Sequence, residues 1–196
     1  NQGKMMNILT IDVDYAYSPS INSYDDYITG SKIKIETEIA LMNERGFKAF
    51  ENPDKLKDIS KCLNLVKSTA SVYIIKYHHQ ILQLLPKNTK YSVYNIDHHH
   101  DVYYPDWHNK EELDEGNWVY HLPNCSDYTW IKNNKSEALP EHNLSFKVTE
   151  MLFSEETLKR LPQFDMVVFC ESPHWTGNNG SLTIKKIIKE WMKKCI

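Results

Sequence analysis

The sequence predicts an α/β fold, a three-layer sandwich in which a mostly parallel, doubly wound sheet lies between helices. Short apolar runs alternate with helical patterns, as is typical of parallel strands joined by crossover helices. The chain has 196 residues, 41% of them hydrophobic, and no internal repeat or linker, so we expect one domain over residues 1–196. Residues 1–5 are expected to be a remnant of cloning outside this fold.

The first half of the chain is predicted to begin with a buried strand that ends in two aspartates. Gly46 is suited to end the first helix, and Asn52 followed by Pro53 is typical of the start of the next one. Pro86 ends a short helix that follows the second strand. The elements expected here are strands at 6–15, 72–75 and 91–96 and helices at 31–45, 53–66 and 79–85.

The second half begins with a long irregular segment after Asp101 that contains Pro105 and acidic residues, and we expect it to be a functional loop. Ser154 followed by glutamates indicates a helix start. Apolar residues then recur every three or four positions near the C-terminus, which predicts an amphipathic helix. The elements expected here are strands at 128–131, 144–148 and 166–170 and helices at 154–161 and 181–195.

Charge and composition exclude several classes of function. The formal charge is -3, with 23 Lys and Arg against 26 Asp and Glu and no basic run, so we expect no binding to nucleic acid or to anionic membranes. No apolar stretch is long enough to span a bilayer and no signal peptide is evident, so we expect a cytoplasmic protein. The 4 cysteines are scattered, which argues against a disulfide framework and a thiolate zinc site.

The most informative segment is the end of the strand at 91–96, which runs directly into Asp97-His98-His99-His100-Asp101. In an extended backbone alternate side chains share a face, so Asp97, His99 and Asp101 can converge while His98 and His100 project elsewhere. Two carboxylates and one imidazole are a donor set that suits a divalent cation such as manganese.

Two other strand ends carry metal-ligating side chains. Asp12 and Asp14 end the first strand, and His78 and His79 follow the strand at 72–75. Because a right-handed crossover places this strand end beside Asp97, we expect one of the two histidines to be a ligand. Four carboxylates and two imidazoles approximate the ligands of two bridged cations, an arrangement that activates water for hydrolysis.

The motifs His78-His79-Gln80, Asp97 to Asp101 and Gly116-Asn117-Trp118-Val119 resemble the ureohydrolase superfamily of arginases and agmatinases. They are most similar to its small, divergent arginase-like branch, which includes the peptide arginases of ribosomal-peptide maturation. The order of the motifs differs from that of ordinary arginases, in which the Asp-x-Asp pair follows the central motif. The likeness covers most of the chain.

The resemblance implies a cytoplasmic enzyme with two Mn²⁺ ions that hydrolyses the guanidinium of arginine to ornithine and urea, with an arginine-containing precursor peptide as substrate. An oligomer is compatible with it. Glu171, at the end of a buried strand, would bind the guanidinium through its carboxylate. His121 or His108 would supply a proton to the leaving amine, with His121 preferred. The resemblance assigns metal binding to Asp12, Asp14, His79, Asp97, His99 and Asp101, catalysis to Glu171, His121 and His78, and substrate binding to Glu171, Asn117 and Trp118.

Three alternatives stay open. Asp97-His98-His99 with an N-terminal Asp-x-Asp is also similar to two-metal phosphoesterases, although their glycine-rich substrate domain has no counterpart here. A zinc deacetylase would need one catalytic metal and fewer carboxylates. A non-catalytic, metal-stabilised module could instead bind a peptide through the aromatic residues around the site, namely Tyr103, Tyr104, Trp107, Trp118, Trp130 and Trp175.

Overall fold

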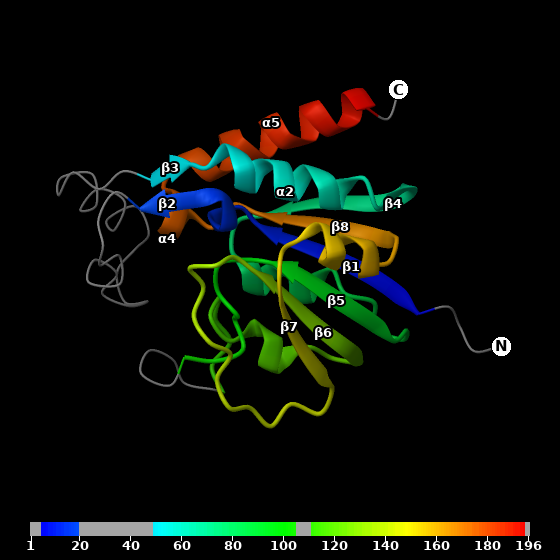
Figure 1. Ribbon diagram of the computed structural model, residues 1–196. Coiled ribbons are helices and arrows are strands. Elements are labelled where there is room, and N and C mark those ends of the chain that lie inside the picture. The colour runs from blue at the N-terminus through cyan, green and yellow to red at the C-terminus, as the bar shows by residue number, and fades with distance from the viewer. Residues whose placement is uncertain (1–4, 20–48, 105–110, 195–196) are drawn as a thin grey trace.

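The computed structural model describes residues 5–19, 49–104 and 111–194. Its centre is a six-stranded parallel sheet with the strand order β4-β8-β1-β5-β6-β7 (Figure 1). The predicted α/β class with a parallel sheet is therefore confirmed. The strands are β1 (Met6–Asp12), β4 (Val66–Ile75), β5 (Tyr91–Ile96), β6 (Cys125–Lys132), β7 (Lys147–Leu152) and β8 (Phe164–Cys170), and β2 (Tyr17–Pro19) and β3 (Ala49–Glu51) form a small antiparallel pair.

Helices and 3₁₀ turns connect the strands. Asn52 caps α2 by accepting hydrogen bonds from the backbone N–H groups of Asp54 and Lys55, and Ser154 caps α3 through the N–H of Thr157, both as expected. The helices are α2 (Pro53–Leu63), α3 (Glu155–Arg160), α4 (Pro173–Thr176) and α5 (Asn179–Lys194), and the 3₁₀ turns are η1 (Val13–Ala16), η2 (His78–Gln83) and η3 (Trp118–His121).

Some predicted boundaries are wrong. Val66 was expected on the apolar face of the helix, but α2 ends at Leu63 and Val66 begins β4, where it pairs with Phe164 of β8. The strand expected at 144–148 lies at Lys147–Leu152. The helix expected at 31–45 lies outside the described residues.

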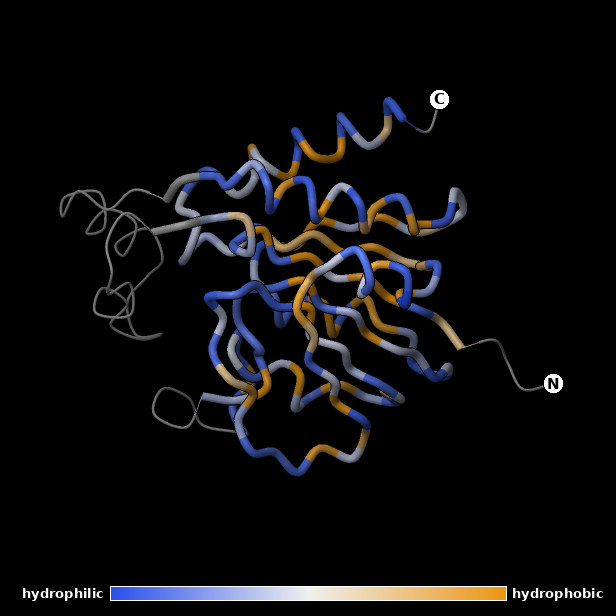
Figure 2. Tube along the Cα trace, viewed as in Figure 1, coloured by the Kyte–Doolittle hydropathy of each residue, from blue (hydrophilic) through white to orange (hydrophobic). Residues whose placement is uncertain are grey.

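The two faces of the sheet are covered differently. On one face, α2 and α5 pack apolar residues such as Ile59 and Ile184 against the inward side chains of β1 and β8 (Figure 1). In Figure 2, α5 alternates between apolar and hydrophilic segments, as a helix with one face on a sheet should. On the other face, η2 and η3 contribute Ile81, Trp118 and Val119, so short 3₁₀ turns and loops replace a layer of α-helices.

The strand order fixes where a ligand would bind. From the central strand β1 the chain passes to β4 on one side and then to β5 on the other, so the connections diverge at β1. In open parallel sheets, ligands bind outside the carboxyl ends of the strands at such a point. Among the described residues, no helix combines the length and the apolar character needed to cross a bilayer, and Cys62, Cys125 and Cys170 are free thiols.

Candidate metal centre

Asp12 and Asp14 lie at the carboxyl end of β1, and both are almost completely buried. The strand ends at Asp12, whose Oδ1 accepts a hydrogen bond from the backbone N–H of Asp14, 3.0 Å away. Asp14 belongs to the 3₁₀ turn η1, so this turn, and not continued strand alternation, sets the relative positions of the two carboxylates.

The segment after β5 brings Asp97 and Asp101 together by bending. Asp97 Oδ1 accepts a hydrogen bond from the N–H of His99 at 2.8 Å, and Asp101 has a left-handed backbone with φ of 52°. The predicted convergence is present, although the extended backbone from which we inferred it is not. His98 and His100 project elsewhere, as expected: His98 Nδ1 lies 3.0 Å from Asn133 Nδ2, and His100 Nδ1 accepts from the N–H of Val102.

These side chains form overlapping groups of possible metal ligands, and two of the groups share Asp97. The first of these two joins His78 to Asp97 and Asp101, and His78 also belongs to a third group with Asp12 and Cys170. His78 Nδ1 lies 3.4 Å from Asp12 Oδ2, 3.2 Å from Asp97 Oδ2 and 2.9 Å from Asp101 Oδ2. In the second group, His99 Nδ1 lies 2.8 Å from Asp14 Oδ2 and 3.9 Å from Asp97 Oδ1. One oxygen of Asp97 therefore faces each of the two groups.

His78, and not His79, reaches the carboxylates. His79 belongs to neither group; its ring stacks parallel to that of Tyr77 at 6.0 Å, and burial lowers its pKa. The assignment of His79 as metal ligand and His78 as catalytic residue is therefore corrected to His78 as the candidate ligand. The turn η2 begins at His78 and directs only its side chain into the cluster.

The electrostatics of the cluster are unbalanced, because four buried carboxylates face two imidazoles. Burial raises the pKa of Asp97 well above its usual value, and the charges of Asp101, Asp14 and Asp12 raise it further. Burial also raises the pKa of Asp12 to about 6, with a contribution from Asp14. Burial alone would lower the pKa of His99, but the carboxylate of Asp14 raises it to about 10. Buried carboxylates in excess call for cations.

The donor atoms fit divalent metal ions. The buried atoms His78 Nδ1 and Asp14 Oδ2 make no well-directed hydrogen bond within the described part of the chain, although ligand atoms surround both. Oxygen and imidazole ligands suit Mn²⁺. Cys170 also lies beside Asp12 and His78, but burial raises the pKa of its thiol, and a protonated thiol is a poor ligand.

Neighbouring polar side chains hold the candidate ligands in place. Thr10 Oγ1 lies 2.8 Å from His78 Nε2, and Asn95 Nδ2 donates to Asp97 Oδ2 at 3.0 Å. Neither residue was predicted from the sequence. Strand alternation could have found them, because Thr10 and Asn95 each precede an aspartate by two positions and so share its face of the sheet.

No family model, curated protein or solved structure matches the chain. The geometry of the cluster is therefore the observation on which a functional assignment has to rest. The sequence resemblance to ureohydrolases remains a hypothesis beside it.

Two residues expected to bind substrate have supporting positions instead. Asn117 is fully buried, and its side chain accepts from the N–H of Asp114 and donates to the carbonyl of Glu112, which closes the loop before η3. Trp118 is fully buried too, and its Nε1 donates to Asp101 Oδ2 at 2.6 Å. Their predicted role in substrate binding is therefore corrected: Asn117 holds the loop, and Trp118 holds the candidate metal ligand Asp101.

The remaining predicted residues lie outside the cluster. Glu171 directly follows β8, its N–H donates to the carbonyl of Ile75, and its side chain is half-buried at the sheet edge that carries the cluster. His121 ends η3 and is half-buried, and its Nε2 makes no hydrogen bond with the described residues. His108 lies outside the described residues.

The rim of the cluster carries a further pair that our sequence analysis did not single out. His174 Nδ1 lies 2.7 Å from Glu115 Oε1, and the His174 ring contacts that of Tyr77. The neighbouring Trp175 packs on His99 with ring centroids 4.3 Å apart. The only available sequence signal was the position of His174 shortly after a strand end.

Proposed function

We propose that this protein is a hydrolase that holds two Mn²⁺ ions and cleaves the guanidinium of an arginine within a peptide, giving ornithine and urea. The observation that carries the proposal is Asp97, whose two oxygens face two separate groups of ligands. A shared carboxylate between two buried groups is typical of two-metal hydrolases.

The first ion would be held by His78, Asp12, Asp97 and Asp101, and the second by His99, Asp14 and Asp97. Two ions so held supply an activated water near neutral pH and stabilise negative charge that develops on the substrate. The protein's own contribution is to fix the ligands: Thr10 holds the ring of His78, and Asn95 and Trp118 hold the carboxylates of Asp97 and Asp101.

The guanidinium substrate is inferred from the residues around the cluster and from the sequence resemblance. Glu171 follows Cys170, which pairs with Asp12 across the sheet, so a carboxylate stands next to the candidate ligands. A carboxylate can accept two parallel hydrogen bonds from a guanidinium, and aromatic rings can stack on the plane of the guanidinium. Glu115, Tyr77 and Trp175 at the rim add a second carboxylate and two aromatic rings.

The reaction requires a proton for the leaving amine. Water adds to the guanidinium carbon, the bond from that carbon to the side-chain nitrogen breaks, and this nitrogen takes up a proton. We assign the donor role to His174, because Glu115 orients its imidazole at the rim of the cluster. His121 is the alternative donor that the sequence favoured.

The proposal is tested with Mn²⁺-loaded protein by measuring urea from an arginine-containing peptide and from free arginine. We expect urea from the peptide, a loss of at least about 10³-fold in Asp97→Asn, and little change in Asp127→Asn, since Asp127 bonds to Ser92 away from the cluster. Hydrolysis of a phosphodiester without urea would support the phosphoesterase instead. Tightly bound metal without turnover of any substrate would support the binding module.

A further inference from the structure

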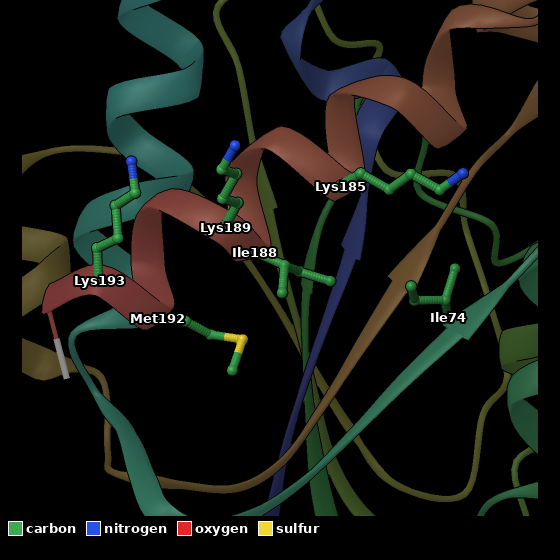
Figure 3. Close-up of a pocket in the computed structure, with 6 residues that line it drawn as sticks. All are labelled: Ile74, Lys185, Ile188, Lys189, Met192 and Lys193. Atoms are coloured by element: carbon green, nitrogen blue, oxygen red, sulfur yellow. The ribbon is translucent and has the colours of Figure 1, made fainter. Parts of the chain in front are cut away.

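A groove lies between the edge strand β4 and helix α5, away from the metal centre. Its volume is about 430 Å³, and it is lined by Ile74 of β4 and by Lys185, Ile188, Lys189, Met192 and Lys193 of α5. Figure 3 shows Ile188 and Met192 projecting from α5 into the space beside Ile74, with the lysines along the helix.

The strand that borders this groove is open on its outer side. β4 is the last strand of the sheet at this end, so its outer edge pairs with no other strand of the described chain. Val72 and Ile74, which share the face toward α5, are 44% and 49% exposed. An open edge offers unpaired backbone donors and acceptors to an extended peptide, and exposed apolar side chains beside it offer contacts for that peptide's side chains.

A row of lysines borders the apolar groove, in a protein that is acidic overall. Helix α5 contains five lysines and one glutamate, whereas the whole chain has a formal charge of -3. Lys185, Lys189 and Lys193 recur every four residues, so they form one exposed row along the groove. The complementary ligand is an extended segment in which carboxylates accompany apolar side chains.

The strand that borders the groove leads toward the end of the sheet that carries the candidate metal centre. β4 ends at Ile75, and His78, the candidate ligand, follows only three residues later. His78 lies four positions after Ile74, a span of at most about 14 Å in an extended chain. A peptide lying along β4 would therefore reach the sheet end that carries the candidate metal centre within a few residues.

We propose that this groove binds an extended, acidic segment of the peptide substrate as an added strand on β4, at a distance from the arginine that reacts. The inference rests on the proposed function, because it takes the ligand to be the substrate peptide. A lipid surface cannot use the open strand edge. A second copy of the chain paired symmetrically across β4 would bring the lysine rows of both copies together, which like-charge repulsion opposes.

Binding is tested apart from catalysis with a fluorescein-labelled peptide of about 12 residues that alternates Glu and Val and contains no arginine. Fluorescence anisotropy measures its affinity for the wild-type protein and for two variants. Lys189→Glu with Lys193→Glu reverses the groove charge, and Lys87→Glu with Lys90→Glu makes the same change at exposed lysines before β5. We expect the groove variant to bind at least about tenfold more weakly and the control to bind like wild type.

Two further peptides test the mode of binding. A peptide that alternates Lys and Val should bind at least about tenfold more weakly than the peptide that alternates Glu and Val, because the lysine row on α5 repels it. A peptide with Pro in place of every second Val cannot pair as a strand and should also lose at least about tenfold in affinity. Equal binding of the proline peptide, or equal binding by both lysine variants, would overturn the proposal.

Other occupants give different results. A concentration-dependent dimer that Ile74→Asp abolishes would assign the groove to a second copy, and binding to phosphatidylserine vesicles in place of the acidic peptide would assign it to a membrane.

Urea assays separate the groove proposal from the proposed function. Equal kcat/KM for a short arginine peptide and for one extended by the acidic segment would contradict the groove proposal alone. Absence of urea from every arginine peptide, with groove binding intact, would contradict the proposed function alone.

Discussion

At the scale of single residues, Thr10 contacts the nitrogen of His78 that faces away from the carboxylates. Its hydroxyl lies 2.8 Å from Nε2, on the far side of the ring from Asp12, Asp97 and Asp101. An imidazole that binds a metal through Nδ1 carries its proton on Nε2, and the Thr10 hydroxyl oxygen is placed to accept a hydrogen bond from this N–H group.

Replacement of Thr10 by Val removes this acceptor at nearly constant volume. We expect Mn²⁺ affinity to fall about 10- to 100-fold, as is typical when a ligand loses the group that orients it. Isothermal titration calorimetry measures the affinity, and Thr129→Val makes the same exchange at a buried position of β6. Equal affinities in the two variants would show that Thr10 does not orient the ligand.

Trp118 acts at the same scale through a hydrogen bond to a candidate ligand. Phe at this position keeps an aromatic ring beside His78 but removes the Nε1 donor to Asp101. Hydrogen bonds to charged groups contribute about 1.5–3 kcal/mol, so we expect Trp118→Phe to lower the free energy of unfolding of the metal-free protein by this amount. Urea denaturation measures it. Trp191→Phe on α5 is the control, and an equal loss there would contradict the role of the Asp101 bond.

Sequence reasoning found most of the candidate metal ligands but chose the wrong one of two adjacent histidines. The aspartates at positions 12, 14, 97 and 101 and His99 lie in the cluster as predicted, because each lies at or just after the end of a strand that hydrophobic patterning reveals. The choice between His78 and His79 depends on how the backbone turns after β4. Two adjacent histidines carry the same pattern, so the sequence contained no signal that could separate them.

At the scale of elements, the junction between α4 and α5 supports the backbone of Glu171. Gly180, in the first turn of α5, lies against the backbone of Glu171, and a Cβ at position 180 would overlap the carbonyl oxygen of Glu171. This carbonyl also accepts a hydrogen bond from Thr176 Oγ1 at 2.8 Å. The start of α5 therefore fixes the peptide unit that carries the proposed guanidinium ligand.

Gly180→Ala should force this junction apart. We expect a loss of about 1–3 kcal/mol in stability from overpacking and a higher KM for the arginine peptide, with the metal content unchanged. Steady-state kinetics with elemental analysis separates the two effects, and Ser181→Ala at the next position is the control. An unchanged KM would show that the backbone position of Glu171 does not matter for substrate binding.

Elements with their own local signals were predictable, and those that depend on distant partners were not. Asn52 with Pro53 and Ser154 fixed two helix starts through capping, which is a local interaction. Val66 fits the periodicity of the preceding helix, but pairing with Phe164, 98 residues away, makes it part of a strand. Tertiary pairing of this kind overrides local periodicity.

At the scale of the whole molecule, the order of the strands brings together the residues of the candidate metal centre. β5 and β8 flank β1, although they lie in the middle and near the end of the sequence. The α/β class followed from the alternation of strands and helices. The full strand order could not be predicted in this way, because strands that pair lie far apart in the sequence and no local pattern shows which of them will pair.

Metal removal tests the molecule as a whole, since the cluster concentrates buried carboxylates in its interior. Metal ions that bind only the folded state stabilise it by about 2.7 kcal/mol per site at a free concentration near 100 times Kd. We expect dialysis against a chelator to lower the melting temperature and Mn²⁺ to restore it, as followed by differential scanning calorimetry. Identical melting temperatures with and without Mn²⁺ would contradict the proposed metal centre.

If Asp97 bridges two metal ions, its loss should lower the number of ions that the protein binds, and a count of bound metal measures this. Equilibrium dialysis against Mn²⁺ followed by elemental analysis should give about two ions per chain for the wild-type protein and for Asp127→Asn. Asp97→Asn, with its fold checked by circular dichroism, should give fewer than about one, because both ligand groups lose a carboxylate. One ion or none in the wild-type protein, or two in Asp97→Asn, would contradict the account.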